Sequence, residues 1–332
     1  MKKIIAVLTS ILLLGCFVAQ AQEDEKPKKR YEVEKKKIYE KTYALGAGDK
    51  VKITNQFGFV KINTWNKSEI NVKVEIIASA KSESRANNLL ESLSITDKKV
   101  SNVVSFKTSI DNDRDNGGSQ TMEINYTVFM PSNNSLDLKN EFGATTISDF
   151  EGMVDITSKF GSLTTGKLTN IEEILVEFGK AKIESMKNGT ATFKFSKAEV
   201  NHLVGSNSLK FEFCDKSKVM VDNDATSVNI NESYSKLYII PSANFSANYN
   251  VRTSFGSFKN RTGNKFTRAD EEPDYGADTD KEYEGQRGSG ACKVKIKSSF
   301  GNIILGQPTT EEMNDEKKKK KKNDDDDDNE EA

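Results

Sequence analysis

The sequence predicts an all-β protein built around a parallel β-helix-like solenoid with repeats of about 18 residues, a flanking antiparallel β-region and one short helix. Three observations predict this fold class. Short runs alternate apolar and polar residues, as in "INVKVEI" at 70–76 and "MEINYTVFM" at 122–130. An aromatic residue followed by a small one recurs at nearly constant intervals between residues 136 and 240. Only one segment has helical periodicity.

Residues 1–21 predict a secretory signal peptide. Lys2 and Lys3 precede an apolar run that ends in "AQA" at 19–21, a pattern of small residues typical of a cleavage site. A second interpretation stays open, because "LLGC" at 13–16 would allow lipidation of Cys16. The run is shorter than the ~20 apolar residues of a spanning helix, so no transmembrane helix is expected after cleavage. We expect a periplasmic, outer-membrane-associated or extracellular protein.

The rest of the chain divides by composition. Residues 22–38 are a charged N-terminal segment, residues 39–306 carry the strand repeats, and residues 307–332 form a Lys/Asp-rich tail. The tail contains "KKKKKKNDDDDD", which has no apolar surface to bury, and we expect it to be disordered. A weak cation site or a docking arm at Asp324–Asp328 is the other interpretation.

Two features precede the central repeats. The unit "ITNQFGFVKINTW" at 53–65 matches the repeat pattern and places Trp65 in an apolar core column. Ser82 can cap the predicted helix "ESRANNLLESL" at 83–93, whose Ala86 and Leu89 share one face with two further leucines.

The central repeats, residues 136–240, are aligned on their aromatic residue. Successive aromatic residues are separated by 18, 18, 17, 18 and 21 positions: Phe142, Phe160, Phe178, Phe195, Phe213 and Tyr234. We expect these rings to point into the core. The residue after each ring is Gly, Ser or Cys, which predicts a bend where a large side chain would obstruct the next repeat.

The residue before each aromatic ring tests how the repeats stack. These residues alternate in charge along the chain: Glu141, Lys159, Glu177, Lys194 and Glu212. In parallel, in-register stacking, equivalent residues of adjacent repeats lie about 4.8 Å apart, so opposite charges attract. The alternation therefore favours parallel stacking over an antiparallel meander.

The C-terminal part repeats the unit twice more, in "VRTSFGSF" at 251–258 and "IKSSFGNIIL" at 296–305. The polar stretch 262–290 lies between them and has no apolar periodicity, so we expect a mobile loop there. A binding loop is the alternative.

Charge and cysteine content exclude some classes of protein. Removing Lys2 and Lys3 with the signal leaves 47 basic and 50 acidic residues, a net charge of −3, which does not fit a nucleic-acid binder. Cys214 and Cys292 could pair in an oxidising compartment, but a disulfide-stapled scaffold would contain more cysteines, so unpaired thiols are favoured.

Catalytic chemistry has little support in the sequence. His202 is the only histidine and adjoins the apolar Leu203, so it should face outward. Glu172 and Glu173 are adjacent, and successive strand residues point to opposite faces, which is unsuitable for a carboxylate pair. We assign no catalytic, cofactor-binding or metal-binding residue, and no cofactor.

The units "NQFGFVKINTWNKSEINVKVEI", "NYTVFMPSNNSLDLKNEFGATTI" and "KVKIKSSFGNIIL" resemble the putative-adhesin family of bacterial β-strand-repeat domains, exported proteins of Bacteroidetes-type bacteria whose function is unknown. The resemblance covers about residues 40–306. It implies a parallel β-helix-like fold and a link to the cell envelope, with no catalytic or binding residue to transfer.

The expected function is a non-catalytic, exported cell-envelope scaffold or adhesin-like protein whose solenoid surface contacts a macromolecule, either a protein or a glycan. The alternative is a carbohydrate-binding module or a carbohydrate-active β-helix enzyme. A binding module would show exposed aromatic residues in a line. Because the aromatic residues are expected to point inward, the sequence favours the scaffold.

Overall fold

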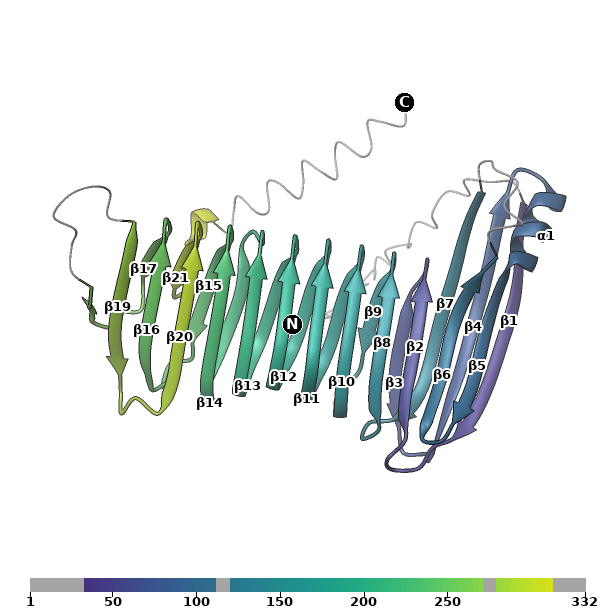
Figure 1. Cartoon of the computed structure of the whole chain (residues 1–332), viewed down its shortest axis with the longest axis horizontal. Coiled ribbons are helices and arrows are strands. Elements are labelled where there is room, and N and C mark those ends of the chain that lie inside the picture. The colour runs from purple at the N-terminus through teal and green to yellow at the C-terminus, as the bar shows by residue number, and fades with distance from the viewer. Residues whose placement is uncertain (1–32, 112–119, 271–278, 313–332) are drawn as a thin grey trace, which may run out of the picture.

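The computed structural model describes residues 33–111, 120–270 and 279–312, and its strands form one sheet of 21 strands with mixed orientation. The prediction of an all-β chain is confirmed. Figure 1 shows the strands side by side in a long row, with the N-terminal strands and α1 at one end and β16 to β19 at the other. The predicted signal peptide, Cys16 and Asp324–Asp328 lie outside the described residues.

The first strands are β1 (Val33–Ala44), β2 (Lys50–Gln56), β3 (Val60–Trp65), β4 (Glu69–Ala80), β5 (Leu93–Val100), β6 (Val103–Ile110) and β7 (Gln120–Pro131). The central strands are β8 (Ser135–Glu141), β9 (Ala144–Ile147), β10 (Phe150–Lys159), β11 (Ser162–Glu177), β12 (Lys180–Lys194), β13 (Lys197–Glu212), β14 (Ser217–Ser233) and β15 (Lys236–Pro241). The last are β16 (Ala247–Ser254), β17 (Ser257–Asn260), β18 (Phe266–Arg268), β19 (Asp280–Arg287), β20 (Cys292–Ser299) and β21 (Asn302–Leu305).

Antiparallel strands and a helix close the N-terminal end. β4 pairs antiparallel with both β1 and β7, and β5 pairs antiparallel with β6. The helix α1 (Glu83–Ser92) buries Ala86 and Leu89 and packs on β4 and β1. Ser82 occupies the N-cap position, but its side chain makes no capping hydrogen bond. Residues 310–312 are also helical, so the prediction of a single helix was incomplete.

The central strands pair in parallel, one repeat against the next. Ile156 lies opposite Ile174, Ile174 opposite Ala191, and Ala191 opposite Leu209. The first half of β11, residues 162–168, pairs with the first half of β12, and its second half, residues 174–177, pairs with the second half of β12. Equivalent residues therefore stack on each other, as the alternating charges predicted.

The core is formed by columns of equivalent apolar side chains. Four residues before each aromatic ring, the column is fully or almost fully buried: Leu138, Ile156, Ile174, Ala191, Leu209 and Ile230. The column eight residues after the ring is buried too: Phe150, Leu168, Met186, Leu203 and Val221. A third buried column lies five residues after the ring: Ile147, Thr165, Ile183 and Val200. In the fifth repeat Val219, six residues after Phe213, continues this column instead of Lys218.

One prediction about a segment was wrong, and one further segment contains a strand that was not predicted. Within the described residues of 262–290, which were expected to form a mobile loop, β18 and β19 form strands, and β19 pairs antiparallel with β16. Residues 33–38 of the predicted charged segment belong to β1. In both places most side chains are charged or polar, including alternate positions on the face that packs, so the apolar periodicity is weak.

The structure shows how deeply Trp65 is buried and whether Cys214 and Cys292 are paired. Trp65 is half-buried rather than in the core: its ring stacks on Phe129 with centroids 5.5 Å apart, and its indole N–H donates to the Glu69 carbonyl at 2.9 Å. Cys214 and Cys292 are buried free thiols, as the favoured interpretation held. Burial raises the pKa of Cys292 to about 11.

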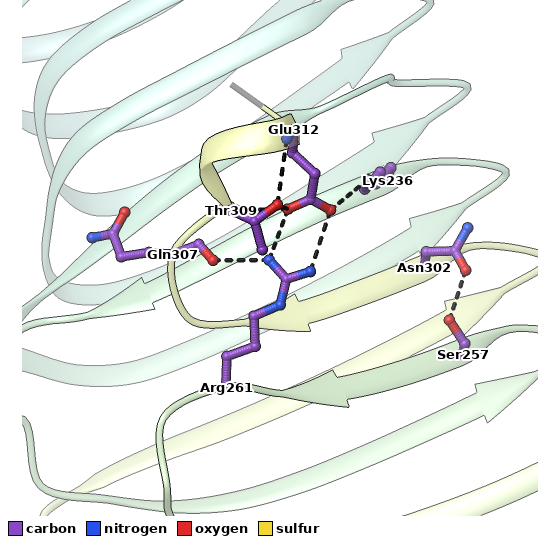
Figure 2. Close-up of polar contacts among 7 residues, drawn as sticks. All are labelled: Lys236, Ser257, Arg261, Asn302, Gln307, Thr309 and Glu312. Carbon is purple, nitrogen blue, oxygen red and sulfur yellow. Dashed lines mark hydrogen bonds and ion pairs between the residues drawn. The ribbon is translucent and has the colours of Figure 1, made fainter. Parts of the chain in front are cut away.

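Residues 307–312, assigned to the tail in the sequence, contact the sheet. The Glu312 carboxylate accepts hydrogen bonds from Arg261 at 2.8 Å and from Lys236 at 3.0 Å, and Thr309 donates its backbone N–H to the same carboxylate at 2.8 Å (Figure 2). Arg261 also donates to the Gln307 carbonyl at 2.9 Å.

Among the described helices, none is long and apolar enough to cross a membrane.

Candidate functional site: an exposed aromatic ladder

Nine aromatic rings form one continuous stack, here called the aromatic ladder. Neighbouring centroids are 4.8–5.0 Å apart and neighbouring planes differ by 1–7°. In spatial order the rings belong to Phe57, Phe142, Phe160, Phe178, Phe195, Phe213, Tyr234, Phe300 and Phe255. Eight such steps give a path of about 39 Å.

The ladder runs along one long edge of the molecule. Each ring follows directly after a strand, as Phe142 follows β8, Phe160 follows β10 and Phe300 follows β20. The carboxyl ends of these strands lie in a row (Figure 1). The backbone hydrogen bonds continue through the edge, since the Phe160 N–H donates to the Glu177 carbonyl and the Phe178 N–H to the Lys194 carbonyl, both at 3.0 Å.

The rings face solvent, so the expectation that they point into the core was wrong. Each ring residue has a positive φ between 48° and 60°, a left-handed conformation that bulky residues rarely adopt. This conformation turns the chain, so the ring points outward and the following residue points inward. The ladder residues are 36–60% exposed, whereas Ser196, Cys214 and Ser235, which follow rings, are buried.

The small residues after the rings are required by close backbone approach. A Cβ atom on Gly161 would lie 2.0 Å from the carbonyl oxygen of Gly143, and one on Gly179 would lie 2.1 Å from that of Gly161. Where serine replaces glycine, the hydroxyl bonds locally: Ser196 donates to the Lys194 carbonyl at 2.7 Å and accepts the Gly179 N–H at 3.1 Å.

A ladder of alternating charges borders the aromatic ladder on one side. Glu177 forms ion pairs with Lys159 at 2.6 Å and Lys194 at 3.5 Å, and Lys194 also pairs with Glu212 at 3.7 Å. Its five residues are Glu141, Lys159, Glu177, Lys194 and Glu212, here called the charge ladder. Hydrogen bonding to Lys159 lowers the pKa of Glu177 below its ordinary value. Parallel stacking of these residues is confirmed.

The stacking decides which part of each ring a ligand can reach. Each inner ring has an aromatic neighbour on both faces, so its exposed part is its edge. Sugars bind aromatic residues by packing against a ring face, and an inner ring has no face to offer. The edge instead presents C–H groups and fits apolar side chains, acyl chains or the faces of other rings.

A buried carboxyl lies beneath the ladder. Glu232 is 3% exposed and accepts the backbone N–H of Ser235 at 2.6 Å and the hydroxyl of Ser298. Removal from water disfavours the charged form, so burial raises the pKa of Glu232 above its ordinary value. Ser298 occupies the equivalent place in the neighbouring repeat, and Thr253 occupies it one repeat further on, where its buried hydroxyl has no hydrogen-bond partner in the structure.

The residues considered for catalysis remain separate from the aromatic ladder. His202 faces outward, as predicted, with Nδ1 2.9 Å from Asp222 and Nε2 3.9 Å from Glu184. Glu172 and Glu173 are both exposed on β11. Across the described residues, no group of three or more His, Cys, Asp or Glu side chains could hold a metal ion.

Comparison with known proteins gives only distant structural similarity. No protein-family model and no curated protein matches the chain. A putative adhesin from Bacteroides fragilis NCTC 9343 is 12% identical, with a TM-score of 0.32 over 81% of this chain and 97% of that chain. A putative cell adhesion protein from Clostridium sporogenes ATCC 15579 is 14% identical, with a TM-score of 0.22 over 82% and 100%.

A putative lipid binding protein from Parabacteroides distasonis ATCC 8503 is 10% identical, with a TM-score of 0.32 over 81% of this chain and 97% of that chain. Two of these three solved structures carry the adhesin name.

Proposed function

We propose that the mature chain is a non-catalytic, exported protein of the cell envelope, adhesin-like in its role, which uses the aromatic ladder to contact another protein. In this proposal the repeats wind as a parallel β-helix-like solenoid, and the ladder follows one of its corners. The observation that carries the proposal is the continuous line of nine half-exposed rings.

The size of this apolar surface supports a contact function. If a Phe or Tyr side chain has roughly 200 Å² of surface, exposures of 36–60% leave about 900 Å² of ring surface in one strip. The largest apolar patch of a typical soluble monomer is about 300–600 Å². One partner in a standard protein–protein interface buries about 800 Å². The strip is thus large enough to form a specific interface.

The orientation of the rings favours a protein over a glycan. Their faces are occupied by each other, while their edges are available for apolar side chains and for edge-to-face contacts with other aromatic rings. The charge ladder beside the strip adds donors and acceptors suited to a polar interface rim. A glycan-binding module, the alternative, would rely on the outer face of Phe255 at the end of the ladder.

The test measures binding of the purified chain, residues 22–332, to the envelope fraction of the producing bacterium. In a triple variant, Phe160→Ser, Phe178→Ser and Phe195→Ser remove three adjacent rings. The matched control carries Thr164→Ala, Lys182→Ala and Glu199→Ala. Each of these residues lies four positions after one of the three rings in the chain, and none of them is buried. We expect the ring variant to lose at least tenfold in affinity and the control to lose none.

Three results would contradict the proposal. Equal binding by both variants would remove the ladder from the contact. Binding that survives protease treatment of the envelope but is lost after glycan removal would support the glycan alternative. Release of soluble products from an envelope polysaccharide would show that the chain is an enzyme.

A further inference from the structure

We propose that a second copy of this chain covers the aromatic ladder, with the two ladders packed edge to edge and antiparallel about a twofold axis. The inference rests on the proposed function in one respect, namely that the ladder is a contact surface. It names the contacted protein as a second copy of this chain, so that ring-dependent binding to the envelope fraction would be binding to copies already on that envelope. Three properties of the ladder carry it: its area, its repeat distance and the order of charges beside it.

The area suits a symmetric dimer. Each copy offers about 900 Å² of ring surface, so coverage of all nine rings would bury about 1,800 Å² in total and coverage of the eight rings from Phe57 to Phe300 about 1,500 Å². Both values lie within the ~1,200–2,000 Å² of a specific interface. In a twofold dimer the same strip serves both subunits, so one self-complementary surface is sufficient.

The repeat distance selects the partner. The rings are 4.8–5.0 Å apart over eight steps, a spacing set by parallel strand stacking. A partner that touches every ring equally must keep the same spacing along about 39 Å. A second copy of this ladder keeps that spacing over its whole length.

The charge ladder specifies the alignment. In an antiparallel pair, the charge ladder of one copy runs beside that of its partner in reverse order. If the eight rings from Phe57 to Phe300 overlap and Phe255 lies outside, Lys159 meets Glu212 of the second copy and Glu177 meets its Lys194, each twice by symmetry. The opposite shift, which leaves Phe57 outside, pairs only Lys194 with Glu212. If all nine rings overlap, Glu177 meets Glu212 and Lys194 meets Lys194, so like charges oppose each other. The alternation therefore selects the eight-ring alignment.

The other border of the ladder has a smaller, opposing effect. In the same alignment Lys180 lies opposite Lys197 of the second copy, twice. Four exposed ion pairs and two like-charge contacts each contribute little individually, because solvent screens them. The charges therefore decide between alignments, while the apolar strip supplies most of the attraction.

The first measurement is the mass of the purified chain, residues 22–332, in sedimentation velocity at 1–50 μM. We expect a dimer. Phe178→Glu places a charge at the centre of the strip and should yield a monomer with unchanged β-type circular dichroism. Thr164→Glu, on an exposed residue of β11 away from the strip, should leave the dimer intact.

The second measurement tests the alignment with native rings, so it does not depend on the folding of Phe178→Glu. Glu177→Cys and Lys194→Cys each lie about one repeat, roughly 5 Å along the axis, from their symmetry mates. Glu141→Cys lies about five repeats, roughly 24 Å, from its mate. A short bis-maleimide should cross-link the first two variants and not the third. Native Cys214 and Cys292 are buried and should not react.

A monomer at every concentration, a dimer unaffected by Phe178→Glu, or equal cross-linking of all three cysteine variants would overturn the inference. Its failure is distinguishable from that of the proposed function. A monomer that binds the envelope through its rings removes only the dimer. A dimer that does not bind the envelope removes only the envelope role.

Discussion

At the scale of single residues, the ladder positions combine a costly backbone with a bulky side chain. A left-handed conformation costs a non-glycine residue roughly 1–2 kcal/mol, and a stacked aromatic pair returns roughly 0.5–1.5 kcal/mol. The two terms are of similar size. Glycine would make the same turn without strain, so the presence of Phe at φ values such as 54° in Phe178 supports the contact role proposed for the rings.

Glu232 should make stability depend on pH in the direction opposite to an ordinary surface carboxyl. Its folded pKa is raised by burial, so its stabilising contribution is complete below the ordinary value near 4.5 and is lost as pH rises through the folded value. Glu232→Gln cannot ionise, and it should gain stability relative to the wild type between pH 4 and pH 8. Urea unfolding at several pH values measures this.

The matched control is Glu284→Gln, which makes the same substitution at an exposed position of β19. If Glu232→Gln instead loses stability steadily as pH rises, the buried carboxylate is stabilising when charged and the interpretation is wrong.

At the scale of elements, the sequence predicted the repeats and their parallel pairing because apolar columns and alternating charges follow directly from stacking. It missed the direction of the rings. Leu163 and Thr165, three and five residues after Phe160, are buried, and so is every small non-glycine residue directly after a ring. The parity of these following positions places the ring outside, but the buried positions two and four residues before the ring, Ser158 and Ile156, have the ring's own parity and place it inside. The left-handed ring residue reverses the alternation, and the sequence pattern does not reveal that reversal.

The ladder should be weaker than the core as a source of stability. Phe178 is 49% exposed and stacks on two rings, whereas Phe193 is fully buried. Phe178→Ala should therefore cost about 2 kcal/mol from half-burial and two stacks, and Phe193→Ala about 3–5 kcal/mol. Chemical denaturation of both variants measures the contrast. Equal losses would mean that the ladder ring is as buried as the core ring.

At the scale of the whole molecule, prediction from sequence succeeded where the repeat is regular and failed at its ends. β19 was missed because its sequence, "DKEYEGQR", packs on one side only and is rich in charge. The contact of residues 307–312 was missed for another reason. It depends on Arg261 and Lys236, which are 51 and 76 residues from Glu312, and no local pattern reveals such a distant pair.

Two truncations test whether the contact of residues 307–312 with the sheet stabilises the fold. Deleting residues 313–332 should leave the melting temperature unchanged, because Glu312 and its partners remain. Deleting residues 307–332 removes the carboxylate beside Tyr238, a residue buried with Ile240 and Ile304 outside the main core. A loss of roughly 1–2 kcal/mol is expected and should lower the melting temperature by several degrees.

The pH dependence identifies the cause of that loss. Hydrogen bonding to Arg261 lowers the pKa of Glu312, so its contribution is present above the ordinary value near 4.5 and is lost as pH falls through the folded value. The difference between the two truncated chains should therefore be largest at neutral pH and shrink toward pH 3, as followed by circular dichroism melts. If the chains melt together at pH 7, or the difference grows on acidification, the contact does not stabilise the fold through this carboxylate.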